Sequence, residues 1–94
     1  MRYLEVMQSA IDTFGEREQM VVAIEELAEL QKELTKILRG GGNRDTLAEE
    51  LADVQIMLDQ LEIIHGDRGA VHEWQTKKMH RLAVRIAERQ AGRG

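Results

Sequence analysis

The chain has 94 residues, 43% of them apolar, which is enough for one hydrophobic core and too little for two. Its 13 Lys and Arg against 17 Asp and Glu give a net charge of −4, which disfavours a protein that binds a nucleic acid polymer. The chain has no Cys, so any metal site must use oxygen or imidazole ligands. No apolar run approaches the ~18 residues that span a bilayer, and the first residues do not resemble a signal peptide. We therefore expect a cytoplasmic domain that does not enter a membrane.

The apolar residues recur three and four positions apart, which is the spacing of amphipathic helices. Glycines interrupt this pattern, and the chain contains no Pro. The predicted helices cover residues 2–14, 17–39, 46–64 and 70–90, and the tail from about 90 to 94 is expected to be frayed. The fold class is therefore all-α, with residues 1–94 forming a single small domain that resembles a four-helix bundle.

Helix boundaries and core residues can also be predicted. The segment from Thr46 to Glu49 has the pattern of a capping box, and Gly40 and Gly66 suit the ends of the second and third helices. The stripe predicted to face the core from the second helix consists of Met20, Ile24, Leu27, Leu30, Leu34 and Leu38. A domain of this size buries only about 60–65% of its unfolded surface, and Ile56 and Ile63 lie off the main stripe of the third helix. We therefore expect a homodimer or a homotetramer.

An acidic motif occurs twice at the same phase of two helices. The residues from Glu25 to Leu30, EELAEL, return 24 positions later as EELADV. Four of the acids lie beside the apolar stripes of their helices, namely Glu26, Glu29, Glu50 and Asp53. If the two helices pack antiparallel, these carboxylates converge and repel one another unless a cation lies among them. Oxygen ligands of this kind favour Mg²⁺, and Mn²⁺ can substitute.

The alternative is a solvated acidic face, which is the usual role of a single Glu-x-x-Glu pair on a helix. The composition of the third helix bears on this choice, because residues 45–67 contain seven acids and no Lys or Arg. These acids are Asp45, Glu49, Glu50, Asp53, Asp59, Glu62 and Asp67. The helix cannot neutralise itself by ion pairs one turn apart, so its compensating charge must come from elsewhere.

The last helix carries the missing bases. Trp74, Lys78, Arg81 and Arg85 lie within about 60° of one another on its helical wheel. Such a stripe beside a metal-loaded acidic seam suits a polyphosphate substrate, with Trp74 as a weak candidate for stacking on a base. Alternatively, Arg81 and Arg85 pair with the acidic third helix and Trp74 belongs to the edge of the core.

Two common phosphate and nucleophile motifs are missing. The run Gly40-Gly41-Gly42 lacks the Lys and Ser/Thr of a P-loop and follows a helix, so it predicts a flexible linker. Ser9 is the only serine, and no His stands at a spacing that would predict a catalytic triad.

The residues together resemble a known family. Glu26-x-x-Glu29 followed by twenty residues and then Glu50-x-x-Asp53 is similar to the E-x-x-E…E-x-x-D signature of the MazG-like all-α nucleoside triphosphate pyrophosphohydrolases. The resemblance extends from about Leu4 to Arg89. It includes the stretches Phe14-Gly15, Ala23 to Lys32, Ala52 to Met57 and Lys78-x-x-Arg81-Leu82-x-x-Arg85-Ile86.

This resemblance implies an Mg²⁺-dependent enzyme that splits a nucleoside triphosphate into a nucleoside monophosphate and pyrophosphate. It implies that the four acids hold the metal, that Glu25 or Glu49 orients the attacking water, and that Lys78 and Arg81 contact phosphate. Phosphoribosyl-ATP pyrophosphatase is the alternative enzyme, although this chain lacks the Pro-containing opening of that enzyme. A non-enzymatic helical interaction module is the alternative from another class.

Overall fold

The computed structural model describes residues 2–92, and this part of the chain is all-helical. Helix α1 spans Tyr3–Phe14, α2 spans Glu16–Leu38, α3 spans Arg44–His65 and α4 spans Arg68–Ala91. The four predicted helices are confirmed within two residues at each end. Gln90 and Ala91, the first two residues of the tail that was expected to fray, belong to α4, and residues 93–94 lie outside the described part.

The start of α3 also differs from the prediction. Asn43 is its N-cap, and the Asn43 side chain accepts a hydrogen bond of 2.9 Å from the backbone N–H of Thr46. Thr46 therefore lies in the first helical turn and does not open a capping box. Asn caps a helix as well as Ser or Thr does, and Asp45 in the first turn favours the earlier start through the helix dipole. The other end agrees with the prediction, because Gly66 adopts the left-handed conformation at the C-cap.

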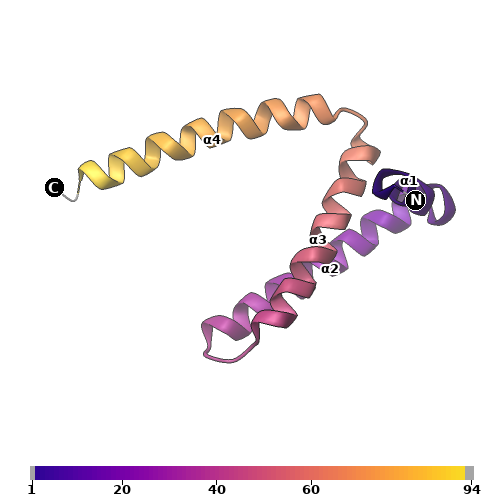
Figure 1. The fold of residues 1–94 in the computed structure, drawn as a ribbon, viewed down its shortest axis with the longest axis horizontal. Helices are drawn as coiled ribbons and strands as arrows, with labels where there is room; N and C mark the ends of the chain where they lie inside the picture. Colours follow the sequence, from indigo (N-terminus) through magenta and orange to yellow (C-terminus); the bar gives the residue numbers. More distant parts are fainter. Residues whose placement is uncertain (1, 93–94) are drawn as a thin grey trace.

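Helices α2 and α3 form an antiparallel hairpin that contains most of the buried residues (Figure 1). Helix α1 lies across the end of this hairpin near the start of α2, and Ile11 is its buried residue. Helix α4 leads away from the other three helices, and none of its residues is buried. The described part of the chain is therefore a small helical bundle in which α1, α2 and α3 form the core and α4 extends from it as an arm.

Polar side chains line the contact between α2 and α3 at intervals of seven residues. Near the start of α2, Gln19 is buried and donates a hydrogen bond of 2.7 Å from Nε2 to Oε1 of Gln60. Glu26, seven residues after Gln19, lies opposite Asp53, which is seven residues before Gln60. Glu33 is buried after seven more. Seven residues are close to two helical turns, so these side chains lie in one line along α2.

The apolar stripe that was predicted to form the core of α2 is mostly exposed. Among residues 2–92, only four apolar residues are buried, namely Ile11, Ala23, Val54 and Met57. Ile24 keeps 67% of its surface exposed, and Met20, Leu27, Leu34 and Leu38 are also exposed. This part of the prediction is wrong for the single chain, because α3 packs about a quarter turn away from that stripe.

The Gln19–Gln60 pair generates a prediction about stability. Gln60→Ala leaves the Gln19 amide buried without its partner, which should lower the free energy of unfolding by about 1–3 kcal/mol. Gln55→Ala is the matched control, because Gln55 is an exposed residue of the same type on the same helix. This substitution should alter the free energy of unfolding by less than about 0.5 kcal/mol. Urea denaturation of both variants measures the difference, and equal effects would contradict the importance of the buried pair.

Candidate metal centre

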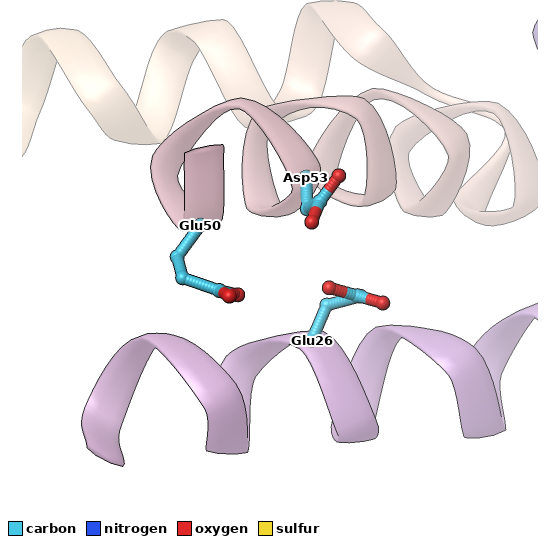
Figure 2. Close-up of side chains that lie close together, drawn as sticks. All are labelled: Glu26, Glu50 and Asp53. Carbon is cyan, nitrogen blue, oxygen red and sulfur yellow. The ribbon is translucent and has the colours of Figure 1, made fainter. Parts of the chain in front are cut away.

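Three carboxylates meet between the hairpin helices. Glu26 reaches across from α2, and Glu50 and Asp53 reach back from α3 (Figure 2). One oxygen from each of them lies within 4.8 Å of the other two, and all three side chains are half-buried. The convergence predicted from the repeated acidic motif is confirmed for these three residues.

The other acids of the motif lie at the margin. Glu29 is exposed and is not part of the close group, but it is near enough to act electrostatically on both Glu26 and Glu50. Glu25 and Glu49 are exposed on the same two helices. Glu49 acts electrostatically on Glu50. The predicted water-orienting role of Glu25 or Glu49 stays a prediction.

Burial and mutual repulsion change the proton affinity of the cluster. Partial burial raises the pKa of Glu26 above its ordinary value, and the negative charges of Asp53 and Glu50, a hydrogen bond to Asp53 and the charge of Glu29 raise it further. Burial likewise raises the pKa of Glu50, followed by the charges of Asp53, Glu29, Glu49 and Glu33. Both carboxylates therefore hold a proton more readily in the folded protein than in the unfolded chain.

One oxygen of the cluster is buried without a partner. Oε2 of Glu50 is inaccessible to solvent and forms no hydrogen bond. A buried carboxylate oxygen without a donor is costly, because the water that it loses is not replaced. A bound cation would supply the missing interaction. Three carboxylate donors and no nitrogen or sulfur donor fit a hard divalent cation such as Mg²⁺ or Mn²⁺, so this group could hold one.

Glu33 is a member of this region that the sequence analysis did not single out. It is only 5% exposed, its charge acts on Glu50, and its Oε1 accepts a hydrogen bond of 3.0 Å from the backbone N–H of Asn43. Because Asn43 caps α3, this bond ties the start of the helix that carries Glu50 to the body of α2. The spacing of seven residues between Glu26 and Glu33 places both side chains on one line of α2 and could have predicted the position of Glu33. It did not, because Glu is usually a surface residue.

The glycine run between α2 and α3 makes the Glu33 contact possible. Gly42 adopts φ +71°, and a Cβ added there would lie 2.8 Å from Cγ1 of Ile37 and 3.0 Å from Oε1 of Glu33. Backbone hydrogen bonds from Gly40 and Gly41 to the end of α2 hold the rest of the run. The expected flexible linker is therefore a defined turn, and the absence of a side chain at Gly42 allows its close approach to Glu33.

The predicted phosphate-binding residues lie elsewhere in the chain. Lys78, Arg81 and Arg85 are exposed on α4, which leads away from the acidic cluster. Trp74 is also exposed, with Nζ of Lys77 5.0 Å from its ring centre. A single chain therefore does not bring the basic stripe to the carboxylates.

The alternatives for these α4 residues are not observed either. Within residues 2–92, the one ion pair between α3 and α4 joins Arg68 to Asp59 at 4.0 Å, so neither Arg81 nor Arg85 pairs with α3. Trp74 does not belong to the edge of the core, because 59% of its surface is exposed.

Comparison with known proteins gives no relative. No protein family, no curated protein and no solved structure matches the chain. The fold and the site thus define an all-α domain with a carboxylate cluster between two antiparallel helices. Within residues 2–92, moreover, no helix combines the length and the apolar character needed to cross a membrane.

The close packing at Gly42 can be tested by comparing substitutions at Gly42 and Gly41. Gly42→Ala should lower the free energy of unfolding by at least about 1–2 kcal/mol, because a left-handed φ is unfavourable for Ala and the new methyl group meets Ile37. Gly41→Ala is the matched control, since a Cβ there would make only an ordinary contact of 3.5 Å with the backbone oxygen of Lys36. Denaturant unfolding gives both values, and equal stability of the two variants would contradict the close packing.

Metal binding should stabilise the folded protein. At a fixed protein concentration, Mg²⁺ or Mn²⁺ at 100 times its Kd should add about 2.7 kcal/mol to the free energy of unfolding, which raises Tm by several degrees. Glu50→Gln should remove this increment, because it keeps the side-chain volume and removes the charge. Glu62→Gln is the matched control, because Glu62 is also half-buried on α3 but lies outside the cluster. This variant should keep the stabilisation by metal. An increment that survives in Glu50→Gln would contradict the assignment.

The same increment should depend on pH. In the metal-free protein, the raised pKa values of Glu26 and Glu50 add stability that is fully present below 4.5 and is lost as the pH rises through the raised values. A metal competes with these protons, so the metal-induced rise in Tm should grow with pH across this window. Differential scanning fluorimetry at several pH values measures it, and an increment that falls as the pH rises through the window would exclude these carboxylates as ligands.

Proposed function

We propose that the protein is an Mg²⁺-dependent nucleoside triphosphate pyrophosphohydrolase, with Mn²⁺ able to replace Mg²⁺. The observation that supports this function most is the convergence of Glu26, Glu50 and Asp53 from two helices, with an oxygen of Glu50 buried and unpartnered. A surface that only confers solubility has no need to bring like charges together in a half-buried position. The resemblance to the MazG-like enzymes supports the same function.

The division of roles follows from the chemistry of the residues. Glu26, Glu50 and Asp53 would hold the metal ion, with Glu29 beside them. When bound, the metal offsets negative charge on phosphate oxygens and lowers the pKa of an attacking water. Glu25 or Glu49 would orient that water. Water attacks the α phosphorus, the bond from that phosphorus to the bridging oxygen breaks, and pyrophosphate leaves while the monophosphate keeps the oxygen from water.

The basic stripe of α4 would bind the phosphate oxygens of the substrate. Lys78, Arg81 and Arg85 carry the positive charge for this role, and Trp74 offers an exposed ring for stacking on a base. Because α4 leads away from the cluster of its own chain, these residues would come from α4 of another copy. We therefore propose that the enzyme works in the cytoplasm as a homodimer or a homotetramer.

An interaction module is the second candidate, and the observation that favours it is the exposed apolar surface of α2 and α4. A phosphoribosyl-ATP pyrophosphatase would use the same cluster for a different substrate. A panel of substrates distinguishes the interaction module and the phosphoribosyl-ATP pyrophosphatase from the proposed nucleoside triphosphate pyrophosphohydrolase.

The reaction can be tested by its products. With Mg²⁺ and a panel of nucleoside triphosphates, hydrolysis in ¹⁸O-water should label the nucleoside monophosphate and leave the pyrophosphate unlabelled. Glu50→Gln should lower the rate by a factor of about 100 or more, and Glu62→Gln should not. Label in pyrophosphate, or orthophosphate as the first product, would contradict attack at the α phosphorus. Turnover of phosphoribosyl-ATP alone would favour the alternative enzyme, and no turnover of any substrate would favour the interaction module.

A further inference from the structure

The start of α3 is capped by a side chain of another helix. In a capping box, the side chain of the third helical residue accepts a hydrogen bond from the backbone N–H of the N-cap residue. The third residue of α3 is Thr46, and the N–H of the N-cap residue Asn43 donates instead to Oε1 of Glu33, 3.0 Å away on α2. A carboxylate of α2 therefore takes the place that a residue of the same helix has in a capping box.

The surroundings of Glu33 favour this contact. Glu33 is only 5% exposed, so little water competes for its carboxylate. The N-terminus of α3 is the positive end of the helix dipole, which attracts a negative group. Because Gly42 has no side chain, the turn can pass close to the carboxylate. Burial, the helix dipole and the glycine together hold Glu33 against the first residue of the α3 cap.

Glu26 and Glu50 lie at equal distances from this contact. Glu26 precedes Glu33 by seven residues on α2, and Glu50 follows Asn43 by seven residues on α3. Seven residues advance an α-helix by about 10 Å. Since α2 and α3 are antiparallel, equal steps away from the Glu33–Asn43 contact reach positions opposite each other (Figure 1). The place where Glu33 holds α3 therefore determines that Glu26 and Glu50 meet.

The contact at Glu33 constrains α3 more directly than the other polar contact of the hairpin. The Gln19–Gln60 bond joins two side chains, and both can adjust their rotamers. Glu33 binds a backbone N–H, so only one side chain lies between the two helices. A shift of α3 by one residue would turn its side chains by about 100° and carry Glu50 away from Glu26.

The mutual position of the carboxylates matters for a cation. Mg²⁺ requires oxygen donors at about 2.0–2.1 Å in a nearly octahedral arrangement, so donors that are displaced bind it poorly. One oxygen of Glu26 and one of Glu50 lie within 4.8 Å of each other, which is close enough for both to reach one ion. Contacts that orient metal ligands from outside are therefore part of a metal centre.

We propose that Glu33 is a positioning residue of the metal centre, and that its bond to the backbone of Asn43 sets Glu50 opposite Glu26 and so determines the affinity for a divalent cation. Glu33 acts through the start of α3 and does not itself bind the ion. This inference rests on the metal centre of the proposed function and deepens it by naming a residue outside the acidic motif. Its test requires no catalysis.

The test is the affinity of the full-length protein for Mn²⁺ without nucleotide, measured from the loss of the electron paramagnetic resonance signal of free Mn²⁺. Binding at the cluster is the part that Glu50→Gln removes. Glu33→Ala removes the acceptor and should weaken this binding by a factor of about 10 or more. Glu33→Gln keeps the length of the side chain and one acceptor oxygen, so it should bind Mn²⁺ nearly as tightly as the wild type.

A second control separates positioning from stability. Ile11→Val removes one methyl group from the buried residue of α1 and should lower the free energy of unfolding by about 0.5–1.5 kcal/mol. It leaves the contact at Glu33 intact and should not change the affinity for Mn²⁺. Circular dichroism checks that each variant is folded. Should Glu33→Ala lose its helical signal, Glu33→Met provides the same comparison, because it keeps the length of the side chain without an oxygen.

The outcomes distinguish this inference from the proposed function. Unchanged affinity in Glu33→Ala, or equal weakening in Glu33→Ala and Ile11→Val, would overturn the positioning role and leave the metal centre in place. Equal weakening in Glu33→Ala and Glu33→Gln would also overturn it, because the charge of Glu33 and not its hydrogen bond would then be responsible. A wild-type protein that binds no Mn²⁺ would overturn the metal centre and the positioning role together. Mn²⁺ binding that depends on the Glu33 acceptor, without turnover of any triphosphate, would support the inference and contradict the proposed reaction.

Discussion

Repulsion among the carboxylates between α2 and α3 is the constraint on which the rest of the structure depends. Three acids share the contact that also forms most of the core, so the helices that hold the fold together are pushed apart at their centre. The hairpin survives because two hydrogen-bonded contacts bracket the cluster. Gln19 binds Gln60 on one side, and Glu33 binds the backbone of Asn43 on the other. These two contacts fix the register, and the register brings Glu26 opposite Asp53.

This arrangement ties stability to ligand binding. The same burial that raises the pKa of Glu26 and Glu50 lowers the stability of the metal-free hairpin at neutral pH, and it also provides a half-buried group of oxygen donors. A structure that served stability alone would place apolar side chains at these three positions, as the neighbouring Val54 and Met57 do. The acids at the centre of the contact therefore point to a function that needs them, and the cost of holding them is met by the hydrogen bonds at either end.

The sequence predicts much of this and misses particular parts for physical reasons. Helical periodicity, glycines and the repeated acidic motif predict the four helices and the meeting of Glu26, Glu50 and Asp53, because these depend on local spacing and on antiparallel packing. Glu33 was not predicted, since its burial depends on the path of the turn at Gly42 and not on its neighbours in sequence. The distance of Lys78, Arg81 and Arg85 from the cluster was not predicted either, because the direction of α4 is set by the short bend at Gly66.

The largest difference between the prediction and the structure concerns the apolar stripe of α2, which is exposed. Periodicity predicts which side of a helix is apolar, but it does not predict whether the surface that covers this side belongs to the same chain. In this hairpin the side of α2 that faces α3 is rich in polar residues, and the side with the regular apolar spacing is exposed. The exposed stripe of α2 and the amphipathic arm without buried residues support the homodimer or homotetramer that we propose. In such an oligomer, a second copy would cover the stripe and would set the basic arm beside the acidic helix.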